Sequence, residues 1–78
     1  MKRRTMATAP PTVEIWVNGE RREIRDGASV ADLVAELGLA PDRVAVELDR
    51  RIVRRADWER ASLSDGARLE LVHFVGGG

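Results

Sequence analysis

The chain has 78 residues, with 13 basic and 13 acidic side chains, 44% hydrophobic residues, one histidine and no cysteine. This length allows one small domain and leaves no room for an enzyme with its own cofactor-binding fold. Without cysteine there is no disulfide and no thiolate metal site, and a single histidine excludes a multi-histidine site. The zero net charge indicates no strong attraction to nucleic acid or to an anionic membrane.

Residues 1–12 are expected to form a disordered leader. They contain Lys2, Arg3 and Arg4, two adjacent prolines and no periodic apolar pattern. When these three basic residues are left out, 10 basic residues remain against 13 acidic ones, so the rest of the chain is net acidic. No apolar stretch follows the basic residues, as a signal peptide would require, and no apolar run is long enough to cross a bilayer. We therefore expect a cytoplasmic protein, with either Met1 or Met6 as its start.

The first structured segment predicts a hairpin. Apolar residues alternate through residues 13–17, which is typical of a half-buried strand. Asn18 and Gly19 follow, and this pair favours a type I′ turn because both central residues need a positive φ. Residues 20–25 then predict a polar second strand with Ile24 on its inward side.

A helix of about two turns is predicted next. Ser29 and Asp32 have the spacing of a capping box, with Asp in place of the usual Glu. Gly38 lies where a left-handed C-terminal cap is expected, and Pro41 prevents the helix from continuing. Apolar residues at helical spacing define one face: Val30, Leu33, Val34 and Leu37.

The second half of the chain predicts three more strands. Residues 44–48 alternate, and residues 52–53 form a short strand after a turn at Asp49 and Arg50. Residues 54–63 form either a turn of helix or a packed loop around Trp58.

The last strand, residues 68–75, has apolar residues on both of its faces. Leu69 and Leu71 lie on one face, and Val72 and Phe74 lie on the other.

The order of these elements predicts an α+β fold, a mixed sheet of four to five strands with one main helix packed on one face. The order suggests a β-grasp arrangement with the first and last strands adjacent in the centre, although composition alone does not select it among small α+β folds. The domain is expected to span residues 13–75, between the leader and a flexible tail at residues 76–78.

The chain ends in three glycines, which two interpretations fit. They are either a frayed end without function, or a thin tail that threads a narrow enzyme channel and presents a free carboxylate for activation by another enzyme. No inward-facing pair of carboxylates is evident, and neither Ser29 nor Ser62 has a base nearby in sequence. The chain is therefore not expected to be an enzyme.

Two segments have a family signature: residues 52–58 read Ile-Val-Arg-Arg-Ala-Asp-Trp, and residues 72–78 read Val-His-Phe-Val-Gly-Gly-Gly. With these, the sequence from Val13 to Gly78 resembles the ThiS-type sulfur carriers of thiamine biosynthesis, which are relatives of ubiquitin with a β-grasp fold. It departs from them at Asp49-Arg50, where the family often has Asn-Gly, and at Arg54, where it often has Pro. The first departure is expected to strain or loosen that hairpin.

The resemblance implies a role for the tail. A ThiF-like adenylyltransferase would adenylate the carboxylate of Gly78, and sulfur from a cysteine desulfurase system would replace the AMP to give a thiocarboxylate (1-thioglycine). Thiazole synthase, a ThiG-like enzyme, would take that sulfur into the thiazole ring. Gly76 and Gly77 would thread the partner's channel. MgATP belongs to the activating enzyme, so we assign no cofactor and no metal to this chain.

Other side chains have structural or binding interpretations. Val72, Phe74 and Val75 form either a partner-binding patch or a surface partly buried under a loop. Trp16 either extends that patch or covers the open sheet face in a homo-oligomer.

Three further residues are interpreted as structural. Trp58 is expected to anchor its loop on the core. Arg55 is expected to bond loop carbonyls or a carboxylate. His73 lies on the inward phase of the last strand, and no ligand role is expected for it.

Two alternatives remain. A molybdopterin-synthase-type sulfur carrier usually has Pro-rich residues before its final glycines, and residues 72–75 here do not. A β-grasp binding module would need a basic or aromatic face, whereas the body is acidic with only three aromatic residues.

Overall fold

In the computed structural model, which describes residues 11–74, five strands form one sheet of order β2-β1-β5-β3-β4. Their bounds are β1 Thr12–Val17, β2 Glu20–Arg25, β3 Val44–Leu48, β4 Arg51–Val53 and β5 Arg68–His73. The first and last strands pair in parallel at the centre, and the other neighbours are antiparallel. The predicted mixed sheet and β-grasp arrangement are confirmed.

Both hairpins turn through two residues with positive φ. Asn18 and Gly19 have φ of 50° and 84°, and Asp49 and Arg50 have φ of 49° and 72°. The second turn therefore keeps the left-handed conformation without a glycine, which costs roughly 1–2 kcal/mol for a residue with a Cβ. Asp49 also connects this turn to β5, because its carboxylate accepts a hydrogen bond from the Arg68 N–H at 3.0 Å. The hairpin is strained, as predicted, and its strands remain paired.

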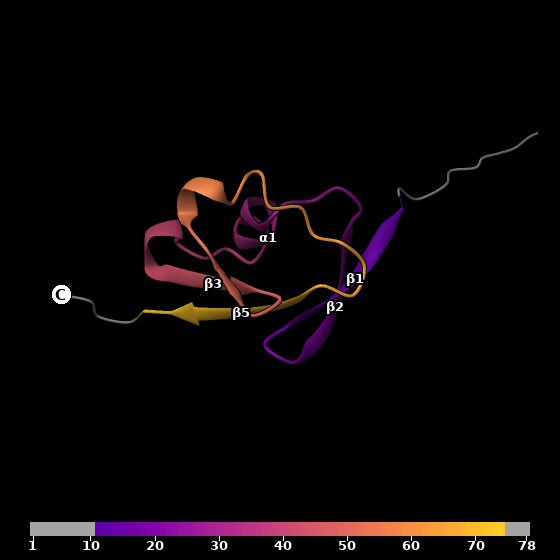
Figure 1. Cartoon of the computed structure of the whole chain (residues 1–78), viewed down its shortest axis with the longest axis horizontal. Helices are drawn as coiled ribbons and strands as arrows, with labels where there is room; N and C mark the ends of the chain where they lie inside the picture. Colours follow the sequence, from indigo (N-terminus) through magenta and orange to yellow (C-terminus); the bar gives the residue numbers. More distant parts are fainter. Residues whose placement is uncertain (1–10, 75–78) are drawn as a thin grey trace, which may run out of the picture.

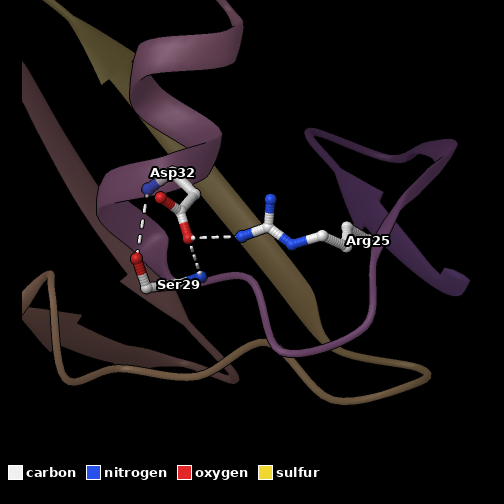
Figure 2. A network of polar contacts seen from close by, with 3 residues as sticks. All are labelled: Arg25, Ser29 and Asp32. Atoms are coloured by element: carbon white, nitrogen blue, oxygen red, sulfur yellow. Dashed lines mark hydrogen bonds and ion pairs between the residues drawn. The ribbon is translucent and has the colours of Figure 1, made fainter. Parts of the chain in front are cut away.

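Helix α1, Val30–Glu36, begins with the predicted capping box (Figure 2). The Asp32 N–H donates to the Ser29 hydroxyl at 3.1 Å, and the Ser29 N–H donates to the Asp32 carboxylate at 2.9 Å. Arg25 reaches the same carboxylate at 3.3 Å. The Ser29 backbone N–H holds the pKa of Asp32 below its ordinary value of 3.8; the Ser29 hydroxyl and Arg25 act in the same direction, and partial desolvation opposes them. Together these contacts stabilise the start of the helix.

One layer covers one face of the sheet. Figure 1 shows α1 and the segment containing the short 3-10 helix η3, Arg55–Asp57, on the same side of the strands. A second 3-10 helix, η2, spans Pro41–Arg43. The buried core between the layers comprises Ile15, Ile24, Ala28, Val30, Leu33, Val34, Val44, Val46, Trp58, Leu63, Ala67 and Leu69. The predicted helix face is confirmed, and the opposite face of the sheet is not covered by any element within residues 11–74.

Trp58 closes the core beside η3. Its side chain is only 4% exposed, and its indole N–H donates to the Val53 carbonyl at 3.0 Å. The prediction that Trp58 anchors its loop is confirmed. Both interpretations of residues 54–63 apply, since a single 3-10 turn leads into a packed loop.

The sheet begins at Thr12, one residue before the predicted start of the domain at Val13. The Pro11 carbonyl also accepts a hydrogen bond from the Asp26 N–H at 3.0 Å. Most of the predicted leader, and residues 75–78, lie outside the described part of the chain. None of the helices within residues 11–74 is long and apolar enough to span a membrane.

Candidate functional site

The predicted site is the C-terminal tail together with the strand that leads to it. Gly76, Gly77, Gly78 and Val75 lie outside the described residues. Their predicted roles therefore remain predictions. The structure describes the base of the tail, because β5 ends at His73 and Phe74 is the last described residue.

Strand β5 presents different residues to its two faces. Leu69 is 2% exposed and packs in the core, and Leu71 packs against the core from the same side. Val72 and Phe74 are 56% and 49% exposed on the other side. Of the two interpretations for this pair, burial under a loop is wrong, because the covering elements all lie on the opposite face of the sheet. An exposed apolar surface at the base of the tail is therefore in place.

Sequence reasoning missed Ile52, which belongs to the same surface. Its side chain is 77% exposed, and with Val72, Phe74 and Ala45 it lines one shallow hollow of about 300 Å³. We call Ile52, Val72 and Phe74 the apolar patch. In the structure β4 pairs with β3 so that Ile52 lies opposite Glu47, an open-face residue. Only the pairing register shows that Ile52 and Phe74 share a face.

Two carboxylates border the apolar patch. Glu47 and Glu70 lie directly opposite one another in the β3–β5 ladder, and both line the hollow that the apolar patch forms. Like charges directly opposite in a sheet destabilise it. Their position beside three apolar side chains makes this end of the open face complementary to an apolar surface with a basic group.

Trp16 lies on the other half of the open face. The Arg68 guanidinium is 5.5 Å from the centroid of its ring, a cation–π distance. Along the open face of β5, Glu70 lies between Arg68 and Val72, so charged side chains separate Trp16 from the apolar patch. The interpretation that Trp16 extends that patch is therefore wrong. The interpretation that it covers the face in a homo-oligomer stays a prediction.

The contacts predicted for Arg55 are not found within residues 11–74. Its side chain is exposed and forms no hydrogen bond or ion pair within residues 11–74. Acceptor groups near Arg55 bond to other residues. The Arg54 carbonyl accepts from the Asp57 N–H, the Arg55 carbonyl accepts from the Trp58 N–H, and the Asp57 carboxylate binds Arg60 at 2.6 Å.

His73 points to the inward side of β5, as predicted. It lines a hollow with Leu37, Leu39 and Leu71 near the end of α1, although its own side chain is exposed. In the part of the chain that the structure describes, no three His, Cys, Asp or Glu side chains are grouped as metal ligands would be.

Comparison with known proteins gives consistent matches. The family model described as the ThiS family matches residues 15–78. The sulfur carrier protein ThiS of Bacillus subtilis is 35% identical over 54 residues, which cover 69% of this chain and 82% of that protein. A crystal structure of the thiamine biosynthesis protein ThiS from Geobacter metallireducens superimposes with a TM-score of 0.73 at 28% identity, covering 85% of this chain and 100% of that one.

Two longer relatives are also similar. Thiazole synthases of Magnetococcus marinus and Paramagnetospirillum magneticum are each 36% identical over 66 residues, which cover 85% of this chain. The chain spans only about a fifth of their length, since the match covers 20% of each. The family match itself runs from the first sheet strand through the three glycines, and the structural match has the same β-grasp fold. On these grounds the chain belongs to the ThiS family.

Proposed function

We propose that this chain is a sulfur carrier in thiamine biosynthesis, a protein substrate on which partner enzymes act rather than an enzyme. The observation that carries the proposal is the family match over residues 15–78, which includes the three glycines. The similarity to a Bacillus subtilis protein named as a sulfur carrier supports the same role. Two of the relatives are named as thiazole synthases and the matched structure as a thiamine biosynthesis protein, so no observation favours the molybdopterin alternative.

The reacting group in this proposal is the carboxylate of Gly78. A free carboxylate is a poor electrophile, because its negative charge repels nucleophiles and it has no good leaving group. A carboxylate oxygen attacks the α-phosphorus of ATP on a ThiF-like adenylyltransferase, the bond to the β-phosphate oxygen breaks, and pyrophosphate leaves. A persulfide sulfur of the desulfurase system then attacks the carbonyl carbon, and a thiol reductant cleaves the S–S bond with two electrons. AMP leaves and a thiocarboxylate remains. MgATP belongs to the activating enzyme, so the chain itself needs no cofactor.

The apolar patch is proposed as the docking surface for these partners. Val72 and Phe74 were predicted for this role with Val75, and Ile52 joins them because it shares the hollow. Glu47 and Glu70 beside the patch favour a partner surface with a basic group at its edge. Thiazole synthase is one proposed partner, because a segment similar to this chain forms part of two thiazole synthases.

The tail is proposed to act through its shape. Gly76 and Gly77 lack side chains, so the backbone can enter a narrow channel and place Gly78 at the reacting phosphate. The division into a leader, a domain ending at residue 75 and a tail at residues 76–78 stays a prediction. A cytoplasmic location also stays a prediction.

Intact-mass spectrometry tests this function. With a ThiF-like adenylyltransferase, MgATP and a sulfur donor, the chain should first gain the mass of an adenylyl group, which is AMP less one water. It should then show the mass difference between sulfur and oxygen. Gly77→Val adds a branched side chain that restricts φ, so it should block both steps while the domain stays folded. One residue added after Gly78 should also block them. Sulfuration of that extended chain, or the absence of any adenylate on the wild-type chain, would overturn the proposal.

A further inference from the structure

Strand β5 is held on its two sides by different means. On the β3 side the ladder runs from Leu69 to His73, and the Phe74 N–H adds a hydrogen bond to the Arg43 carbonyl at 2.7 Å. On the β1 side the parallel pairing ends at Leu69, because the chain turns back at Asn18. Beyond Leu69 the main chain of β1 offers no partner on that side.

Asn18 extends the contact along β5 from Leu69 to Leu71. Its own N–H donates to the Leu69 carbonyl at 2.9 Å. Its side-chain Oδ1 accepts from the Leu71 N–H at 2.8 Å, and its Nδ2 donates to the Leu71 carbonyl at 3.2 Å. A carboxamide has the same donor and acceptor as a peptide group. The Asn18 side chain therefore takes the place that the next peptide of β1 would occupy.

Leu71 depends on this contact. In an antiparallel pair, the backbone groups of alternate residues point to opposite sides of the strand. Arg68 and Phe74 bond toward β3 and its turn, through Asp49 and Arg43. Leu71 is three residues from Arg68 and three from Phe74. By the same alternation its backbone N–H and C=O therefore point away from β3, toward β1. Within residues 11–74 Asn18 is the only hydrogen-bond partner of those groups, so without it the end of β5 would be held from the β3 side alone.

We propose that Asn18 is a positioning residue for the C-terminal tail. By binding both backbone groups of Leu71, it fixes the direction in which β5 delivers the chain to residues 75–78 and thereby the approach of the Gly78 carboxylate to ATP. This inference rests on the proposed function. Asn18 is not part of the apolar patch, so its effect passes through Leu71. Rate is sensitive to such placement, because a misplacement of about 1 Å can lower it roughly 100-fold.

The chain offers a matched pair of variants. Asn18→Gly keeps the turn, since glycine adopts positive φ freely, and it removes only the carboxamide. Asp49→Gly is the control. Like Asn18, Asp49 is the first left-handed residue of a two-residue turn. Its carboxylate also accepts a hydrogen bond from a backbone N–H of β5, that of Arg68. That contact lies at the start of β5, far along the strand from the tail.

Two measurements test the proposal. Amide hydrogen exchange of Leu71, followed by NMR, should be about 10-fold faster in Asn18→Gly and unchanged in Asp49→Gly, because only the first variant exposes that N–H. Pyrophosphate release with a ThiF-like adenylyltransferase and MgATP should show kcat lowered about 10-fold in Asn18→Gly. KM for the chain should not change, because the apolar patch is intact. Asn18→Asp keeps the acceptor for the Leu71 N–H, so its kcat should lie between those of Asn18→Gly and the wild-type chain. If Asn18→Gly does not fold, the same two measurements are made on Asn18→Asp.

The outcomes separate the two proposals. Faster exchange at Leu71 with a wild-type kcat would overturn the positioning role and leave the sulfur-carrier role standing. Unchanged exchange at Leu71, or an equal loss of kcat in Asp49→Gly, would also overturn it. If the wild-type chain releases no pyrophosphate, the proposed function fails and the positioning role fails with it, whatever the exchange at Leu71.

Discussion

The two faces of the sheet use similar residues for different purposes. On the covered face, α1 and the segment around η3 bury Ile15, Val46 and Leu69 almost completely. On the open face, Ile52, Val72 and Phe74 remain exposed, although they are as apolar as the core residues. Strand β5 contributes to both faces within a few residues. Whether an apolar side chain stabilises the fold or is available to a partner therefore depends on which side of the sheet it points to.

The open face is itself divided. Near β1 and β2 it carries charged contacts, such as Arg21 with Glu14 at 3.1 Å and Arg68 over Trp16. Toward β3, β4 and the end of β5 it carries the apolar patch. Exposed ion pairs contribute little to stability, whereas a contiguous apolar surface marks an interaction site. The difference locates the proposed docking surface at the end of the sheet from which the tail leaves.

The largest expected effect is on the covered face. Trp58→Ala should lower the free energy of unfolding by about 3–5 kcal/mol, because it removes a buried ring and leaves the Val53 carbonyl without its donor. Urea denaturation followed by circular dichroism measures this. Trp16→Ala is the matched control on the open face, and its loss should be much smaller. Equal losses for the two tryptophans would contradict the division between the faces.

On the open face, Phe74→Ala should change binding rather than stability. Stability should stay within about 0.5 kcal/mol of wild type, while binding to thiazole synthase or the adenylyltransferase should weaken by roughly 1–3 kcal/mol, as it does for interface anchors. Titration calorimetry and thermal unfolding together measure the two effects. Glu23→Ala, in the charged half of the face, should leave both unchanged. Wild-type affinity with a collapsed melting temperature would assign Phe74 to the core.

A smaller effect is expected at the hairpin that carries Ile52 to the open face. Arg50→Gly should relieve left-handed strain of about 1–2 kcal/mol, offset by about 0.4–1 kcal/mol from the freer unfolded chain. The net gain in stability should lie between about 0 and 1.6 kcal/mol by the same estimates. Gly19→Ala, in the other hairpin, should shift stability in the opposite direction, because Gly19 has a φ of 84°. Destabilisation by Arg50→Gly would show that the side chain of Arg50 contributes more than its strain costs.

The smallest effect concerns the helix on the covered face. The pKa of Asp32 is lowered in the folded chain, so its ionised carboxylate stabilises the fold above the ordinary value of 3.8. This contribution should be lost as the pH falls from that value through the lower folded pKa. Asp32→Asn should therefore reduce the loss of stability in acid, measured by urea unfolding at a series of pH values. An identical pH dependence in the variant would assign that loss to other carboxylates.

Much of the fold follows from local patterns in the sequence. The capping box at Ser29 and Asp32 and the left-handed turn at Asn18 and Gly19 each depend on residues close together along the chain, and each is predicted correctly. The alternation in β5 also predicts its two faces, because successive side chains of a strand point to opposite sides. The class of function rests on residues 52–58 and 72–78, which resemble one family.

Tertiary structure decided which of these residues share a surface. Ile52 and Phe74 line the same hollow because β4 and β5 both pair with β3, which lies between them. Within residues 11–74 the side chain of Arg55 has no hydrogen-bond or ion-pair partner, and the nearby Asp57 carboxylate binds Arg60 instead. Asn18 binds Leu71, 53 residues away, because β1 and β5 pair in parallel and β1 ends two residues earlier along the ladder. Local sequence sets the conformation of each element, whereas the register between distant strands sets which side chains and backbone groups come within hydrogen-bonding or packing distance.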